Sequence, residues 1–264
     1  MPRNSLGQRM DGLAILSGFG IGAIVGMTGV GGGSLMTPLL ISVFRLSPAL
    51  AIGTDLWFAA ITKASGSVAH HRLGHVDYRI AGRLLAGSIP ASMATIAVMH
   101  LTGISKGWAS ALTFSLGIAL LLTALTVAYR KAWHALGLRL ERWLPEQRKP
   151  ALTVAAGAVL GVLVSLSSIG AGAVGATLIM LLYPRLPAHR LVGTDIAHAV
   201  PLTLVAGIGH ATLGHVDWSL LAALLVGSLP GIWLGAQLTR AMPERLVRGL
   251  LCASLVTAGL KVIG

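Results

Sequence analysis

The sequence predicts an all-α integral membrane protein made of two inverted structural repeats, each with about five helical segments. Three observations lead to this fold class: an apolar composition, an internal duplication, and an uneven distribution of lysine and arginine among the connections. Each repeat is expected to start with a short helix that is broken by glycines or re-entrant. The predicted organisation is a first membrane repeat (1–129), a charged cytoplasmic connector (130–150) and a second membrane repeat (151–264).

The composition is that of a chain that lies in lipid. Hydrophobic residues make up 55% of the sequence and charged residues 11%, whereas ordinary soluble domains have about 25% charged residues. The net charge of +12 comes from lysines and arginines spread over short connections. Because they form no basic stripe and the chain has no soluble domain to carry one, we expect no nucleic-acid partner.

Apolar segments follow one another along both halves of the chain. A hydrocarbon core about 30 Å thick takes about 20 helical residues per crossing. The apolar run from Leu13 to Phe44 is therefore too long for one helix and too short for two, so a discontinuous element is expected there. The predicted segments are 12–27, 33–44, 48–69, 78–101 and 107–129 in the first half, and 151–168, 173–184, 189–212, 218–239 and 246–263 in the second.

The two halves of the chain are homologous to each other. A shift of 140 residues aligns 45–90 with 185–230 without gaps and gives 17 identities in 46 positions. The identities include the triplet Gly-Thr-Asp, the tetrapeptide Gly-His-Val-Asp and the pattern Gly-Ser-x-Pro, each present once per half. Self-similarity at a fixed spacing indicates an internal duplication.

The basic residues indicate how the two halves are oriented. If each repeat crosses the membrane an odd number of times, one side has 14 lysines and arginines and the other has 5, whereas an even number gives 12 against 7. Basic connections favour the cytoplasm, and equivalent connections of opposite bias are typical of inverted repeats. We therefore predict that both termini lie outside and that the connector lies in the cytoplasm.

A glycine-rich stretch interrupts each repeat near its start. Unpaired backbone groups of a broken helix are tolerated at membrane depth only where they line a cavity or are buried in protein, and helix N-termini attract anions. The two breaks are thus expected to form an anion site near the midplane, although such glycines also serve tight helix packing. The candidate substrate-binding residues here are Thr28, Gly29, Gly31, Gly32, Gly33 and Ser34 in the first break and Ser168, Gly170 and Gly172 in the second.

Polar residues inside the apolar segments complete the candidate site, because an ionisable residue in a membrane segment is a functional candidate by default. The Gly-Thr-Asp triplets also suit a helix restart, with threonine as the cap. Lys63 would neutralise an anion or snorkel to the surface. His198 would shuttle protons or be a packed, hydrogen-bonded histidine. The further candidates are Thr54, Asp55, Lys63, Thr194, Asp195 and His198.

The Gly-His-Val-Asp tetrapeptides are predicted to be hairpins in which Asp77 and Asp217 cap the following helices. His70, His71 and His210 lie near them in the sequence. These histidines lack the carboxylate and thiolate neighbours of a strong metal signature. We expect no metal site and no cofactor.

Together, the run Gly-x-x-Gly-Val-Gly-Gly-Gly-Ser-Leu-x-x-Pro (26–38), the Gly-Thr-Asp triplets, the Gly-His-Val-Asp hairpins and the Gly-Ser-x-Pro segments resemble the TauE/SafE family of sulfite exporters. The resemblance covers about 12–263. It implies a multi-pass permease of the bacterial inner membrane for small sulfur-containing or organic anions, and it supports the glycine breaks and the Gly-Thr-Asp triplets as site residues. Ala171 stands where the first half has Gly31, so two identical sites are not expected.

We therefore predict a secondary transporter, not an enzyme, that moves a small anion by alternating access. The expected substrate is a sulfur oxyanion or an organosulfonate. The sequence has no ATP-binding P-loop, so protons are the coupling ion that we consider. The alternative is a divalent metal-cation permease that uses the loop histidines. The expected partners are the anion and the lipid bilayer, and a homodimer is an option that the sequence leaves open.

Overall fold

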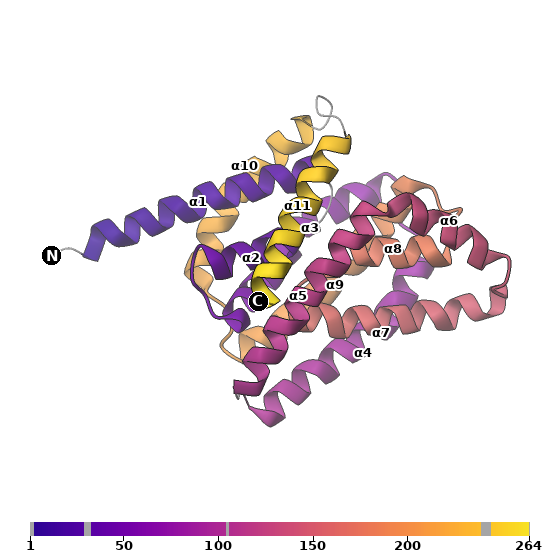
Figure 1. The fold of residues 1–264 in the computed structure, drawn as a ribbon, viewed down its shortest axis with the longest axis horizontal. Helices are drawn as coiled ribbons and strands as arrows, with labels where there is room; N and C mark the ends of the chain where they lie inside the picture. Colours follow the sequence, from indigo (N-terminus) through magenta and orange to yellow (C-terminus); the bar gives the residue numbers. More distant parts are fainter. Residues whose placement is uncertain (1–2, 29–32, 104–105, 239–243, 264) are drawn as a thin grey trace.

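The computed structural model describes residues 3–28, 33–103, 106–238 and 244–263, which form α-helices joined by short connections and contain no β-strand (Figure 1). The predicted all-α fold class is thereby confirmed. The eleven α-helices of this part of the chain are α1 (Arg3–Thr28), α2 (Gly33–Ser42), α3 (Pro48–Arg72), α4 (Tyr78–Thr102), α5 (Lys106–Ala128), α6 (Arg130–Glu141), α7 (Lys149–Ser167), α8 (Ala173–Leu182), α9 (Ala188–Thr212), α10 (Trp218–Leu238) and α11 (Glu244–Ile263).

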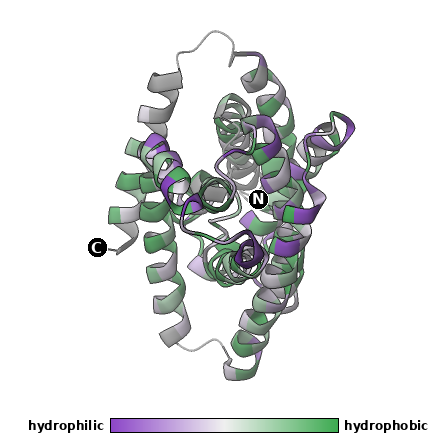
Figure 2. Ribbon diagram, turned by 90° about the vertical axis from the view of Figure 1, so that its right-hand side faces the viewer, coloured by the Kyte–Doolittle hydropathy of each residue, from purple (hydrophilic) through white to green (hydrophobic). Residues whose placement is uncertain are grey.

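Several helices have the length and composition of membrane spans. Figure 2 shows hydrophobic residues along most of the helices and hydrophilic residues concentrated near the connections. Large apolar side chains such as Val159, Val226 and Trp233 are more than half exposed, as expected for surfaces that face lipid. Five helical stretches are long and apolar enough to cross a membrane: Tyr78–Thr102, Trp108–Ala128, Glu146–Ser167, Ala188–Thr212 and Trp218–Gly235.

Helices that are distant in the sequence pack closely through glycines. A Cβ added at Gly157 of α7 would lie 2.1 Å from the carbonyl oxygen of Leu84 in α4, and one added at Gly18 of α1 would lie 2.2 Å from that of Leu224 in α10. Small residues allow such backbone contacts between membrane helices. The pairs α4–α7 and α1–α10 therefore each join one half of the chain to the other (Figure 1).

The helices α3 and α9 pack against each other and carry the buried polar residues of both halves. The indole N–H of Trp57 in α3 donates to the carbonyl of Gly207 in α9 at 2.9 Å. Leu56 and Leu202 are fully buried in the same hydrophobic cluster. These contacts fix the position of the Gly-Thr-Asp triplets, which lie within the second turn of each helix.

The helices α7 and α8 form a hairpin in which the start of α7 lies beside the end of α8. Tyr183 follows α8, and its hydroxyl lies 2.8 Å from Oγ1 of Thr153 in the second turn of α7. The helix α8 has ten residues and rises about 15 Å, which is about half of the hydrocarbon thickness. The turn at the inner end of the hairpin is buried at Ser168 and Ile169.

The observed helix boundaries follow the predicted segments closely, with three differences. The helix α1 begins at Arg3, well before the predicted start. The connector contains α6, whose Gly137 packs against the backbone of Met180 in α8. The helix restart proposed for the Gly-Thr-Asp triplets is wrong, because α3 begins at Pro48 and α9 follows Pro187, and proline is well suited to the start of a helix.

Candidate functional site

The turn between α7 and α8 is held by a left-handed backbone and by short polar contacts. Ser168 has a φ of 59° and Gly170 a φ of 123°, and the second value is one that glycine alone adopts readily. The Ser167 hydroxyl donates to the carbonyl of Leu163 at 2.6 Å and accepts from the N–H of Ile169 at 3.2 Å. The second half of the chain thus contains the expected glycine-broken helix.

The corresponding stretch of the first half lies partly outside the described residues. Gly29, Gly31 and Gly32 are among those not described, whereas Thr28 is the last residue of α1 and Gly33 and Ser34 are the first residues of α2. The role of these six residues in substrate binding stays a prediction.

The start of α8 presents backbone N–H groups to the break. This helix begins at Ala173, after Gly172, and the N–H of Gly175 bonds back to the carbonyl of Gly170 at 2.8 Å. Within the described residues, the N–H groups of Ala173 and Val174 have no hydrogen-bond partner. Free N–H groups at a helix N-terminus and the partial positive charge of the helix dipole both favour a bound anion.

Lys63 of α3 reaches this break across the interface between the two halves. Its ammonium group donates a hydrogen bond to the carbonyl of Ala171, between the two helices of the hairpin. It also interacts electrostatically with Asp55 and Asp195, although neither carboxylate forms a direct ion pair with it among the described residues. The alternative that Lys63 snorkels to the surface is therefore wrong.

Asp55 is one of two carboxylates buried beside the lysine. Its side chain is fully buried, and its Oδ2 accepts a hydrogen bond from the hydroxyl of Thr37 in α2. The Ser168 side chain lies next to it. Oδ1 of Asp55 and Oγ of Ser168 are nevertheless both buried without a well-formed hydrogen bond in the described part of the chain.

Asp195 of α9 is the second carboxylate and lies directly against α8. A Cβ added at Gly175 would lie 2.3 Å from Oδ1 of Asp195, so the carboxylate rests on the glycine backbone. The residue is 5% exposed and its Oδ1 has no hydrogen-bond partner among the described residues. The two aspartates that the duplication makes equivalent thus approach the same break.

His198 lies one helical turn after Asp195 and is fully buried. Its Nε2 lies 3.0 Å from the hydroxyl of Ser88 in α4, and it interacts electrostatically with Lys63. Its Nδ1 is buried without a partner in the described residues. The imidazole is thus hydrogen-bonded at one nitrogen, and its second nitrogen is available for a proton or a ligand.

The cluster has more carboxylic acids than ammonium groups. It holds one ammonium group and two carboxylic acids, and burial of an unbalanced charge costs several kcal/mol. Three of its polar atoms, on Asp55, Asp195 and His198, are buried without partners in the described residues. A cluster of this kind can bind an anion through Lys63 and the start of α8 if one of the carboxylates carries a proton.

Thr54 and Thr194 form hydrogen bonds that the sequence did not suggest. The Thr54 hydroxyl accepts a hydrogen bond of 3.0 Å from the N–H of Asp217, and the Thr194 hydroxyl accepts one of 2.9 Å from the N–H of Asp77. Each Gly-Thr-Asp triplet is thereby docked on the Gly-His-Val-Asp hairpin of the other half. The predicted N-caps are confirmed, because Oδ1 of Asp77 and of Asp217 accepts N–H groups of the following helix.

The loop histidines do not form a metal site in the described residues, where no three histidine, cysteine or acidic side chains are placed to hold a metal ion. His210 is hydrogen-bonded through Nε2 to the carbonyl of Ser165 at 2.8 Å. Its ring lies 5.4 Å from that of His215.

Sequence reasoning missed three parts of the cluster: Thr37, Ser88 and Gly175. Ser88 belongs to the Gly-Ser-x-Pro pattern, and repetition of that pattern does not by itself assign a role to the serine. Its counterpart Ser228 bonds to the carbonyl of Leu225 in its own helix, since the residue equivalent to His198 is the buried Phe58. At these aligned positions the first half has Phe58 and the second half has His198. A histidine in an apolar segment needs a polar partner, and this difference between the halves was the signal that could have pointed to Ser88.

Comparison with known proteins agrees with the resemblance found in the sequence. The family model for the sulfite exporter TauE/SafE matches residues 14–262. The probable membrane transporter protein YjnA of Bacillus subtilis (strain 168) is 38% identical over 252 residues, which are 94% of this chain and 98% of that protein. The probable membrane transporter protein YdhB of the same strain is 29% identical over 255 residues, covering 95% and 99% of the two chains. No solved structure matches the chain. The chain therefore belongs to the sulfite exporter TauE/SafE family of membrane transporters, which are not enzymes.

Proposed function

We propose that the protein is a secondary transporter that binds a small anion at the break between α7 and α8 and moves it across the bacterial cell membrane. The substrate class that we propose is a sulfur oxyanion or an organosulfonate, in line with the family. The observation that carries the proposal is the ammonium group of Lys63 at the carbonyl of Ala171, beside the N–H groups of Ala173 and Val174, which have no partner within the described ranges of the chain.

The chemistry of these groups suits an oxyanion. A buried ammonium group and free N–H groups at a helix start both donate hydrogen bonds to negatively charged oxygens. An anion that accepts from Lys63 would replace the carbonyl of Ala171 as its partner. Gly170, Gly172 and Ser168 would then shape the turn that receives the anion.

Protons are the coupling ion in this proposal. With Lys63, Asp55 and Asp195 all charged, the cluster has one net negative charge. A bound anion would add a second net negative charge, which is costly unless one carboxylate is neutralised. Entry of the anion would therefore accompany protonation of an aspartate, and release of the anion would accompany loss of that proton. The Nδ1 of His198, which is without a partner in the described ranges, would relay protons between Asp195 and the pathway.

Alternating access follows from the organisation of the chain in two halves, 1–129 and 151–264, which we propose to be inverted repeats. Three contacts support this arrangement: α1 with α10, α4 with α7, and each Gly-Thr-Asp triplet with the hairpin of the other half. The α7–α8 hairpin would be re-entrant from the cytoplasmic side. The first break, with Thr28, Gly29, Gly31, Gly32, Gly33 and Ser34, would enter from the outside.

The test is anion flux in proteoliposomes, with sulfite and sulfoacetate as substrates. Lys63→Met is expected to abolish flux while the protein still inserts and remains monodisperse. Lys131→Met, in the exposed part of α6, is the matched control and is expected to transport normally. Gly32→Leu tests the first break in the same way. Normal flux by the Lys63→Met variant would overturn the proposed site.

A further inference from the structure

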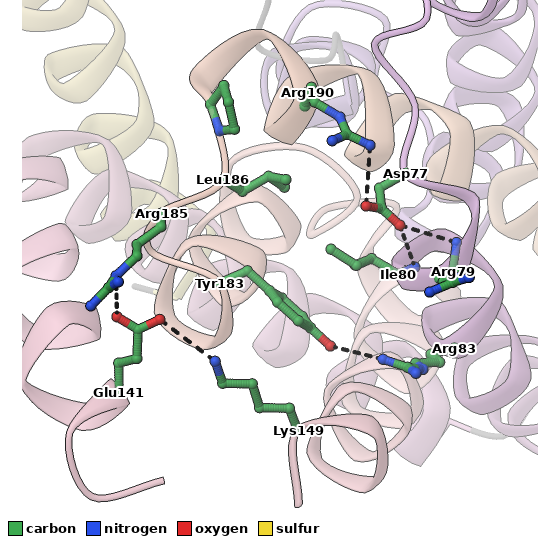
Figure 3. A pocket seen from close by; sticks show the side chains of 11 residues that line it. Asp77, Arg79, Ile80, Arg83, Glu141, Lys149, Tyr183, Arg185, Leu186 and Arg190 are labelled. Carbon is green, nitrogen blue, oxygen red and sulfur yellow. Dashed lines mark hydrogen bonds and ion pairs between the residues drawn. The ribbon is translucent and has the colours of Figure 1, made fainter. Parts of the chain in front are cut away.

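A polar cavity of about 430 Å³ lies where the start of α7 and the segment after α8 come together, apart from the Lys63 cluster. Figure 3 shows that its side chains come from the starts of α4, α7 and α9, from the end of α6, and from the segment after α8. The residues that matter here are Asp77, Arg83, Glu141, Lys149, Tyr183 and Arg190.

Cations outnumber anions in this cavity. Five lysines and arginines line it, against two carboxylates. Glu141 is already paired with Lys149 at 3.6 Å and with Arg185 at 2.9 Å. Asp77 pairs with Arg190 at 3.3 Å and also caps α4. Lys149 also pairs with Glu146 at 2.5 Å. The acidic groups are thus occupied, and Arg79 and Arg83 are the two lining cations without a carboxylate partner in the described part of the chain.

Arg83 is the clearest of these uncompensated cations. The one contact of its guanidinium among the described residues is with the hydroxyl of Tyr183, at 3.5 Å. The same hydroxyl is held by Oγ1 of Thr153 at 2.8 Å. Arg190 of α9 has a buried Nε without a hydrogen-bond partner in the described part of the chain. Arg83 of α4 and Arg190 of α9 therefore each have donors that are unused in that part of the chain.

We propose that this cavity binds a phosphate-type oxyanion, with Arg83 and Arg190 as its main ligands and Tyr183 as the group that orients Arg83. Planar guanidinium groups match the oxygens of a phosphate and bind them with two parallel hydrogen bonds. The cavity is large enough to hold a phosphate with organic substituents. This site is separate from the Lys63 cluster and does not depend on the proposed transport.

The neighbouring surface of α6 makes a phospholipid headgroup one source of that phosphate. Leu136, Leu140 and Trp143 follow one another at helical spacing and are 40%, 43% and 86% exposed, and the helical turn continues to Trp143 through its N–H bond to the carbonyl of Leu140. Arg139 and Arg142 lie on the adjacent stripe. Such a helix is typical of the membrane interface, where basic residues meet anionic lipids. Free inorganic phosphate is the other source.

The test measures binding of two probes to the purified full chain in detergent. Inorganic phosphate represents the free anion, and short-chain phosphatidylglycerol represents the lipid. We expect saturable binding of at least one probe, and we expect Arg83→Gln to weaken it by about tenfold, as the loss of a charge-assisted hydrogen bond implies. Binding of phosphate alone would assign the site to a free anion, and binding of the lipid alone would assign it to a headgroup.

The matched control is Arg130→Gln, an exposed arginine at the start of α6 that does not line the cavity, which is expected to bind both probes as the unmodified chain does. Arg79→Gln, at the rim of the cavity, provides a second variant if Arg83→Gln is not monodisperse. The proposal is overturned if neither probe binds, or if the control weakens binding as much as the cavity variants do.

Discussion

The carboxylate of Asp195 rests on the backbone of Gly175, where an added Cβ would lie 2.3 Å from Oδ1. Any residue larger than glycine at position 175 would displace this carboxylate. The contact joins α9, which carries Asp195 and His198, to the start of α8, where two N–H groups have no partner among the residues that the structure describes. The contact between Asp195 and Gly175 thus fixes the position of one carboxylate at the break.

Gly175→Ala is expected to displace the Asp195 carboxylate and to reduce anion flux by about tenfold or more, while the cost in folding free energy stays at about 1–3 kcal/mol. Flux in proteoliposomes and thermal unfolding in detergent measure the two effects. Gly82→Ala is the control, because a Cβ there meets nothing within 4 Å. Equal flux in the two variants would show that the position of Asp195 does not matter for transport.

Asp195→Asn is expected to separate anion movement from proton movement, because asparagine resembles the protonated acid and cannot release a proton. A pH-sensitive dye inside proteoliposomes would record proton entry with the anion in the unmodified protein and none in the variant. Asp55→Asn tests the other carboxylate in the same assay. Glu146→Gln, whose side chain is exposed, is the control. Unchanged proton movement in both aspartate variants would contradict coupling through these residues.

Much of the fold could be predicted because membrane helices leave a strong signal. Long apolar runs, bounded by Pro48 or by the glycines of the hairpins, identify most helices. The helix α6 was missed because its charged residues resemble a connector, and its packing on α8 depends on Gly137, a tertiary contact. The helix restart at Thr54 was wrong for a related reason, since the role of this threonine lies in the other half of the chain.

The candidate site could be predicted only in part. Lys63, Asp195 and His198 were identified because ionisable residues are rare in apolar segments, and the structure brings them to one break. Ser88 and Gly175 could not be assigned, because their importance comes from a neighbour twenty or more residues away in the sequence. The docking of each Gly-Thr-Asp triplet on the hairpin of the other half could not be predicted either, since identical motifs do not indicate which copy contacts which.

Thr54→Val and Thr194→Val are expected to destabilise the protein by about 1–3 kcal/mol each, because each leaves a hairpin N–H without its acceptor. Thermal unfolding in detergent measures this loss. Thr54→Ser and Thr194→Ser retain the hydroxyl and are expected to restore most of the stability. A weaker anion affinity in the valine variants, without any loss of stability, would instead indicate that these hydroxyls bind the substrate.

The burial of His215 leads us to expect that the stability of the protein depends on pH. It lies in the hairpin between α9 and α10, is 6% exposed, and burial lowers its pKa from about 6.5 in the unfolded chain. A histidine with a lowered pKa in the folded state resists protonation there, so its contribution to stability is complete above about pH 6.5 and is lost as the pH falls further.

Acidification from about pH 7 to about pH 5.5 is therefore expected to lower the thermal unfolding midpoint of the protein. The decrease should be smaller in His215→Gln, which cannot gain the proton that the folded hairpin disfavours. The control is His100→Gln at the exposed end of α4, for which the decrease should match that of the unmodified chain. The hairpin that contains His215 joins the two halves, because the N–H of Asp217 donates to Oγ1 of Thr54. Protonation of His215 would therefore weaken the contact between the halves, and an equal decrease in all three proteins would exclude His215 as the cause.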